Sequence, residues 1–340
     1  MEMKRKISYF LMACAALAMT MSCARTVTSY NYADAKRYLE AWMSQRYPDI
    51  KPNADGLYVL EETQGTGDLV EGNDYVFLTY TVRTIDGTVE KTTDPEMSKQ
   101  LGTYEKATYY GDHVWKFADN NQTAGVEYAL KGLKAGGSRK VVIPRWLLTY
   151  NRHDSVEGYL DDTKGASSDY IYEFTVSEAT DSLDRWQIDT IDRYIAANYD
   201  KSQVIKESRG FRYIRLQEPT DTTAYKKDST FYINYTGRLL NGQVFDTTDP
   251  KVAKIHNVYS ASRTYAPVKI KMGETYSDIT MSGSSTITGF ALTLWNMRPY
   301  EKAVGIFYSN YGYGASGSGD KIPEYAPLIF EIEIVDEPDE

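Results

Sequence analysis

The 340-residue chain contains only two cysteines and three histidines, and its 38 Lys and Arg residues are outnumbered by 47 Asp and Glu residues. The formal charge of −9 argues against a nucleic-acid partner or an anionic membrane surface, because each would require a basic face. His113, His153 and His256 are scattered, with no second ligand at the spacing of a metal site. The glycine-rich segment 312–319 lacks the lysine and following helix of a phosphate-binding loop. We therefore expect no metal, no cofactor and no nucleic acid.

Residues 1–22 are predicted to be a targeting signal rather than part of the fold. Basic residues at positions 4–6 precede an apolar segment, 7–21, that is too short to span a membrane. The segment ends in the sequence TMSC, residues 20–23, which resembles a bacterial lipoprotein signal. This resemblance implies cleavage before Cys23 and lipidation of its thiol. An ordinary secretory signal with an incidental cysteine is the alternative.

Cysteine use agrees with a lipid anchor. Cys14 would leave with the signal, so Cys23 would be the only cysteine of the mature chain. A single thiol forms no internal disulfide in an oxidising compartment, whereas lipidation gives it a use. No acidic run follows Cys23, so nothing marks export to the outer cell surface. We expect a periplasm-facing protein that is lipid-anchored to a bacterial membrane, with the outer membrane favoured.

The rest of the chain repeats itself with a period of about 155 residues. An alternating strand pattern at 76–81 recurs at 232–236, and the tetrapeptide TTDP recurs at 92–95 and 247–250. Between these features, an Asp-Gly pair in the first copy and an Asn-Gly pair in the second favour a tight turn. Each copy therefore predicts two strands joined by a hairpin turn.

A helical segment precedes each copy. Apolar residues recur at helical spacing over 34–45 and again over 188–199. We predict an α+β protein of two domains, and we expect the second helix to bridge the copies and to pack on one or both. The predicted units are a signal peptide (1–22), a tether with the N-terminal helix (23–50), the first domain (51–179), a linker helix (180–203) and the second domain (204–340).

Three separated segments of the second copy resemble the FKBP-type peptidyl-prolyl cis–trans isomerases. They are 231–249 (FYINYTGRLLNGQVFDTTD), 286–297 (TITGFALTLWNM) and 311–336, where a glycine-rich loop leads into a strand. They occur in the family's order over residues 210–336, with an expanded region at 251–286. The resemblance implies that each domain is a curved antiparallel sheet wrapped around a short helix, with an apolar pocket between helix and sheet.

The resemblance also implies the pocket residues of the second copy. Phe290 takes the place of the aromatic floor at the start of the helix. Ile287 would offer a backbone N–H to one substrate carbonyl, and Tyr313 would offer its hydroxyl to another. Ile322 would close the pocket from the loop. The implied wall residues are Tyr235, Phe245, Asp246 and Phe330.

Two positions of the second copy depart from the family pattern. Val268 falls where an aromatic residue is common, and Lys251 stands near a usual arginine. Asp246 is expected to orient Tyr235 or a neighbouring donor rather than to act as a general base.

The first copy keeps the scaffold and loses much of the pocket. Glu90 and Lys91 stand at the wall positions, Val126 stands at the floor, and the loop tyrosine is displaced to Tyr150. Charges beside a prolyl ring are costly unless they turn to solvent. We predict that this copy is degenerate and is not an isomerase.

The sequence thus predicts a peptidyl-prolyl cis–trans isomerase that assists the folding of exported proteins. Its partners would be proline-containing polypeptides, and catalysis would be non-covalent in the second domain. Two alternatives stay open on the same fold. A non-catalytic peptide-binding chaperone is favoured by Val268, the expanded region and the degenerate first copy. A docking lipoprotein rests only on the repeat and the anchor.

Overall fold

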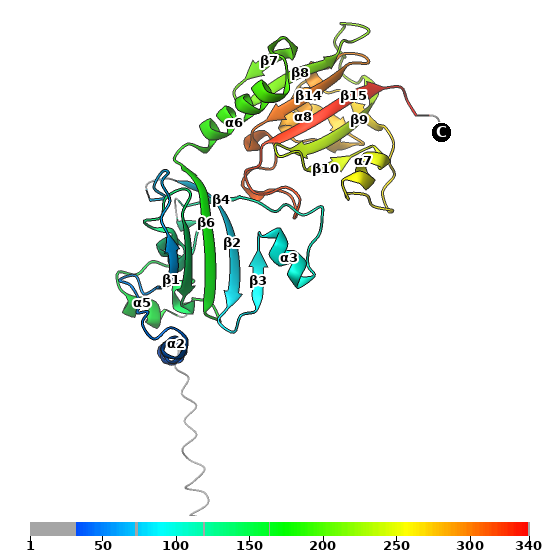
Figure 1. Ribbon diagram of the computed structural model, residues 1–340. Helices are drawn as coiled ribbons and strands as arrows, with labels where there is room; N and C mark the ends of the chain where they lie inside the picture. Colours follow the sequence, from blue (N-terminus) through cyan, green and yellow to red (C-terminus); the bar gives the residue numbers. More distant parts are fainter. Residues whose placement is uncertain (1–31, 72–73, 118–119, 163, 339–340) are drawn as a thin grey trace, which may run out of the picture.

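Two antiparallel sheets follow one another along the chain, each with its own hydrophobic core (Figure 1). The computed structural model describes residues 32–71, 74–117, 120–162 and 164–338. The predicted signal peptide and Cys23 lie outside these residues. No helix in the described ranges is long and apolar enough to cross a membrane.

The strands of the two sheets occur in the same spatial order. The first sheet contains β1 (Tyr58–Thr63), β2 (Tyr75–Thr84), β3 (Val89–Thr92), β4 (His113–Lys116), β5 (Ser138–Ile143) and β6 (Tyr170–Thr180). The second contains β7 (Val204–Ser208), β8 (Phe211–Gln217), β9 (Thr230–Leu239), β10 (Val244–Thr247), β11 (Val268–Lys271), β12 (Thr280–Met281), β13 (Ser284–Ser285), β14 (Lys302–Phe307) and β15 (Leu328–Val335). The path β1-β5-β6-β2 corresponds to β8-β14-β15-β9, and β3 and β4 pair with β2 as β10 and β11 pair with β9.

This shared topology confirms the internal repeat. The offset between copies is 155 residues at β4 and β11, and 164 residues at β5 and β14. The second domain therefore has nine extra residues between these points, where the short helix η4 (Tyr276–Asp278), β12 and β13 lie. The expanded region predicted from the sequence is thus partly an ordered insertion.

The helices confirm the expected α+β organisation, because one long helix precedes each sheet and one short helix packs inside each domain. The α-helices are α2 (Ala33–Arg46), α3 (Pro95–Leu101), α4 (Ala124–Leu130), α5 (Val156–Asp161), α6 (Leu183–Asn198), α7 (Pro250–Ile255) and α8 (Thr288–Asn296). The other 3₁₀ turns are η2 (Arg145–Leu147), η3 (Lys201–Gln203), η5 (Ser309–Tyr311) and η6 (Gly314–Ser316).

The repeated TTDP tetrapeptide fastens a helix to the central strand in each domain. The Thr248 hydroxyl accepts a hydrogen bond from the Tyr235 N–H at 2.9 Å, and Thr93 does the same for Tyr80 at 2.9 Å. The following aspartate caps the next helix, as Asp249 does for α7, and proline occupies the first helical position. One short motif therefore fixes both the start of a helix and the backbone of a tyrosine on the central strand, Tyr235 or Tyr80.

Helix α6 joins the two domains, as the sequence predicted. Its Trp186 ring lies 4.1 Å from the ring of Phe77 in the first sheet. The fully buried Gln187 donates from Nε2 to Ser309 Oγ and to the Tyr325 carbonyl, both at 3.0 Å, in the second domain. The rest of its apolar face packs on the second sheet. The connection between the domains is therefore a packed helix and not a loose linker.

Helix α8 lies close against β14, and small residues make that approach possible. A Cβ added at Gly305 would clash with the Thr293 hydroxyl, which donates to the Gly289 carbonyl at 2.8 Å. We expect Gly305→Ala to lower the free energy of unfolding by about 1–3 kcal/mol, because overpacking forces helix and strand apart. Urea denaturation of the full chain measures this loss.

The double variant Thr293→Ala/Gly305→Ala is the control. Removing the hydroxyl relieves most of the clash, so the double variant should lose less stability than the sum of the two single variants. Additive losses would show that the approach of α8 to β14 is not the cause.

Candidate active site

Four buried aromatic rings from four elements converge in the second domain. Phe330, on β15, is at the centre of the group. Its ring centroid lies 5.0 Å from Phe290 on α8, 5.5 Å from Phe245 on β10 and 6.1 Å from Tyr235 on β9. The contacts to Phe290 and Phe245 are edge-to-face, the arrangement that the ring quadrupoles favour. The group forms a rigid floor and wall.

A glycine on the central strand makes this convergence possible. A Cβ at Gly237 would lie 2.5 Å from the Phe245 ring and 2.9 Å from the Phe330 ring. In the first domain the residue at this register is Val82, which pairs with Tyr172 as Gly237 pairs with Phe330. The first domain therefore has a side chain where the second leaves room for two rings.

These rings border a cavity of about 510 Å³ between α8, the sheet and the loop after β14. The structure brings all the sequence-predicted site residues together around it. They are Tyr235, Phe245, Asp246, Ile287, Phe290, Tyr313, Ile322 and Phe330. The other lining residues had no role predicted from the sequence; they are Met281, Ser285, Thr286, Ser318 and Lys321.

A hydrogen-bonded network closes one side of the cavity. The Tyr235 hydroxyl donates to Asp246 Oδ2 at 2.6 Å, and Arg263 pairs with Asp246 and donates to the Tyr235 hydroxyl at 3.2 Å. Burial, and then the Asp246 carboxylate, raise the pKa of Tyr235 well above its ordinary value, so this hydroxyl remains a donor. The sequence pointed to Lys251 as the residue near the family's arginine. In the structure Arg263, from a later loop, supplies the guanidinium.

Arg263 reaches the site from a loop after α7 whose shape recurs in both domains. The Tyr259 and Tyr265 rings stack at 5.1 Å, and Lys254 lies 4.9 Å over Tyr259. The lysine and the two tyrosines occur at the same spacing in both copies of the sequence, and this repeat could have indicated the loop. In the first domain the same arrangement is formed by Lys99, Tyr104 and Tyr110.

Polar groups from two loops border the rest of the cavity. Ile287 is the residue just before α8, so its N–H lies outside the helical hydrogen-bond ladder. Burial raises the pKa of Tyr313 above its ordinary value, and its side chain is 37% exposed. The Thr286 hydroxyl is buried and has no hydrogen-bond partner among the described residues. The cavity thus combines an aromatic floor with unused donors at its edge.

The first-domain residues that correspond to the cavity lining, called here the pocket position of the first domain, differ from it in charge, in the floor residue and in the loop tyrosine. Glu90 and Lys91 are exposed, and the Lys91 ammonium lies 5.4 Å over the ring of Tyr80. Val126 lies at the start of α4 in place of an aromatic floor, and Tyr150 is 65% exposed. In the ranges that the structure describes, no three His, Cys, Asp or Glu side chains are grouped to hold a metal ion.

Comparisons with known proteins agree with this geometry. The family model for FKBP-type peptidyl-prolyl cis-trans isomerases matches residues 221–335. The chain is 30% identical over 114 residues to FK506-binding protein 2 of Dictyostelium discoideum. The match covers 34% of this chain and 69% of that protein. The chain belongs to the FKBP-type peptidyl-prolyl cis–trans isomerase family. This is an enzyme class that acts on proline-containing peptides.

Two further similarities extend over more of the chain. A probable FKBP-type peptidyl-prolyl cis-trans isomerase of Haemophilus influenzae is 21% identical over 247 residues, covering 72% of this chain and 87% of that protein. The crystal structure of the three FKBP domains of wheat FKBP73 has a TM-score of 0.29 and 16% identity, and the match covers 83% of this chain and 94% of that one.

Arg263, and not Lys251, is expected to anchor the loop after α7 through its ion pair with Asp246. We expect Arg263→Ala to speed amide hydrogen exchange in residues 256–267 by about tenfold, because the loop loses its charged anchor. Mass spectrometry of the full chain measures this rate. Lys251→Ala is the matched control, since Lys251 has an exposed side chain on the adjoining helix α7. Equal effects of both variants would contradict the assignment of Arg263.

Proposed function

We propose that the aromatic cavity of the second domain is the active site of this isomerase. The observation that carries the proposal is the convergence of eight side chains, implied one by one by the sequence, on one cavity. A proline ring fits such a site, because it is apolar and presents no N–H that would need a partner. The cavity volume of about 510 Å³ is also in the usual range for small-ligand sites.

The site needs no nucleophile for this chemistry. Rotation about the peptide bond before proline is slow because amide resonance sets a barrier of about 18–20 kcal/mol. Burying the prolyl ring on Phe290 and Phe330 removes the amide from water, which favours the twisted, less dipolar transition state. The Ile287 N–H and the Tyr313 hydroxyl would hold the flanking peptide carbonyls. The residues thus bind and orient the peptide, and no covalent bond is made or broken.

Asp246 has a supporting role in this scheme. Its carboxylate accepts a hydrogen bond from the Tyr235 hydroxyl and forms an ion pair with Arg263. It is therefore committed to fixing the wall of the site rather than to moving a proton.

The open cavity favours catalysis over the non-catalytic alternative. Segment 275–285 would abolish the site if it filled the pocket. Instead, only Met281 and Ser285 of that segment contribute to the lining, and they border the space. The first domain has charges at the wall and no aromatic floor, so we assign the activity to the second domain alone.

We further propose that the protein works at a bacterial membrane as a lipid-anchored folding helper for exported proteins. The support is the sequence alone: basic positions 4–6, the short apolar segment 7–21 and the cysteine that follows it. A chain with a net charge of −9 is not attracted electrostatically to anionic lipid. A covalent lipid on Cys23 is therefore the membrane attachment that the sequence supports.

The activity is tested by a proline-limited refolding assay and by a short peptide that contains one Leu-Pro bond. We expect Phe290→Ala to lower kcat/KM by about tenfold or more, a loss of roughly 1.4 kcal/mol of transition-state stabilisation. Tyr313→Phe should cost about threefold to tenfold, since one hydrogen bond is lost. The full chain is used, and circular dichroism checks that each variant is folded.

Tyr150→Phe is the matched control for Tyr313→Phe. It removes the displaced tyrosine hydroxyl of the first domain, and we expect no change in kcat/KM. A wild-type protein without activity, or an unchanged rate in the combined variant Phe290→Ala/Tyr313→Phe, would refute the assignment of the site.

The anchor is tested by expressing the whole chain, signal included, in a Gram-negative host. The wild-type protein should partition into the detergent phase and carry a labelled fatty acid, and Cys23→Ser should do neither. A mature protein that starts at another residue or stays in the aqueous phase would leave only the ordinary secretory signal.

A further inference from the structure

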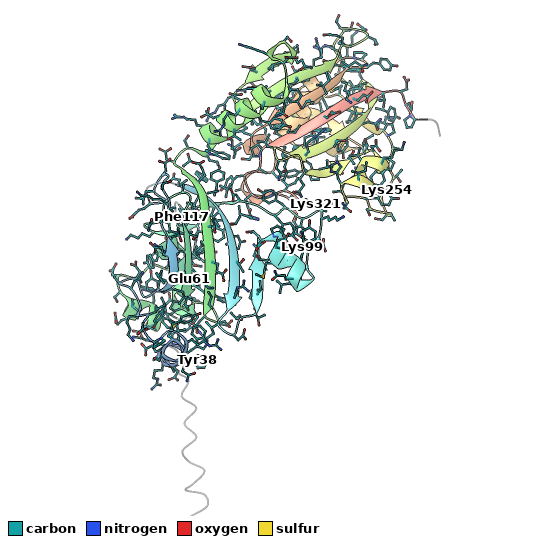
Figure 2. The ribbon with its side chains drawn as sticks, viewed as in Figure 1. Tyr38, Glu61, Lys99, Phe117, Lys254 and Lys321 are labelled. Carbon is teal, nitrogen blue, oxygen red and sulfur yellow. The ribbon has the colours of Figure 1, made fainter. Side chains whose placement is uncertain are left out.

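The loop that closes the cavity, residues 312–327, extends from the second domain toward the first (Figure 1). Four of its residues line the cavity, among them Lys321 and Ile322, and Figure 2 labels Lys321 on the side that faces the first domain. Just before them, the Asp320 carbonyl accepts a hydrogen bond from the Tyr109 N–H of the first domain at 2.7 Å. Tyr109 also packs against the core of the second domain. The first contact therefore anchors the loop on one side of Ile322.

A second contact anchors the loop on the other side of Ile322. Nδ1 of His113, on β4 of the first domain, lies 2.8 Å from Oε2 of Glu324. The imidazole is mostly buried between the rings of Tyr80 and Tyr109, whose centroids lie 5.9 and 5.8 Å away. The hydrogen bond with His113 holds the pKa of Glu324 below its ordinary value, so the carboxylate is charged at neutral pH.

The position of His113 in the first sheet is informative. His113 pairs with Leu78 in the register in which Val268 pairs with Ile233 in the second sheet. His113 is thus the first-domain counterpart of Val268, the residue at the predicted thin wall of the pocket.

Two other first-domain residues that correspond to the cavity lining interact electrostatically with Glu324. Tyr80 and Lys91 are the counterparts of Tyr235 and Asp246, and the Lys91 ammonium lies 5.4 Å over the Tyr80 ring. Lys91 lowers the pKa of Glu324, and Glu324 raises the pKa of Tyr80 after the larger effect of burial. The Lys91 charge, which is unsuited to a prolyl ring, therefore favours a carboxylate.

We propose that the first domain uses its own pocket position to bind the loop of the second, and that His113 positions Ile322 over the active site through Glu324. The proposal rests on the function proposed for that site. The ligand of the first domain is then a segment of the same chain, residues 320–325, in which the Glu324 carboxylate meets His113.

The loop has few other contacts that would hold residues 314–322 in place. Its C-terminal end is fixed through Tyr325, whose carbonyl accepts from Gln187 and whose ring packs 5.5 Å from Tyr75. Between residues 314 and 322 the loop is tied mainly to itself, through the Ser318–Ile322 bridge and the Tyr325 N–H to Gly314 carbonyl bond. Ordering such a loop costs conformational entropy, which a pre-existing anchor removes from the binding step.

The experiment compares the full-length wild-type chain with His113→Ala. We expect amide hydrogen exchange in residues 314–327 to speed up by about tenfold. With the Leu-Pro peptide, KM should rise by about threefold to fivefold with a smaller change in kcat, because Ile322 contacts ground state and transition state alike. Glu324→Gln should behave like His113→Ala, and it provides the test if the histidine variant does not fold. His113→Gln keeps an N–H donor and should restore part of the effect.

His153→Ala is the matched control. His153 lies 2.9 Å from Asp162 within the first domain, so this variant removes a similar histidine–carboxylate contact away from the loop. It should change neither exchange in the loop nor KM. Unchanged exchange in both His113→Ala and Glu324→Gln would overturn the proposal even if the enzyme is active.

Two further outcomes would each overturn the positioning role. Faster exchange with an unchanged KM would show that the loop is held but that holding it does not serve the pocket, which overturns the positioning role. A wild-type chain without isomerase activity would refute the proposed function, and the positioning role would fall with it. The exchange rates would still decide whether the first domain holds the loop.

Discussion

The packing of Phe330 against Gly237 is the constraint on which the second domain depends. Because the strand carries no side chain at Gly237, Phe330 and Phe245 meet over β9, and Phe290 and Tyr235 close the group. The same rings belong to the hydrophobic core and to the cavity lining. The free energy that folds the domain therefore also holds the proposed site rigid, without a separate supporting structure.

The first domain shows what happens when that constraint is released. Val82 fills the place of Gly237, and the wall positions become Glu90 and Lys91, of which Lys91 lies over the Tyr80 ring. These changes depend on one another, because an aromatic residue at position 90 would meet the Val82 side chain. The sheet order, the TTDP helix cap and the stacked-tyrosine loop are all retained. The scaffold is thus specified separately from the pocket, and a copy can lose one while it keeps the other.

Much of this organisation could be predicted from the sequence, since it lies in local pattern and in repeated motifs. Strand alternation, the turn dipeptides and TTDP report contacts within about 20 residues. The repeat then transfers them from one copy to the other, and the family motifs selected the residues around the cavity. Arg263 was missed because Lys251 is nearer in sequence to the expected arginine, whereas the long loop returns to Asp246 from 17 residues away. Sequence spacing does not determine the path of such a loop.

The contacts between domains were the least predictable part, because each joins groups more than 100 residues apart in the sequence. Helix α6 was expected to bridge the copies and to pack on one or both, but nothing in its periodicity shows that Gln187 bonds to the end of the active-site loop. The sequence spacing indicated only that His113 has no second metal ligand near it, and it carried no sign that His113 meets Glu324 across 211 residues. The two anchors explain why a domain without a prolyl pocket would be retained. Its altered pocket position stabilises one conformation of its neighbour's loop, and that role requires the charges which a catalytic pocket excludes.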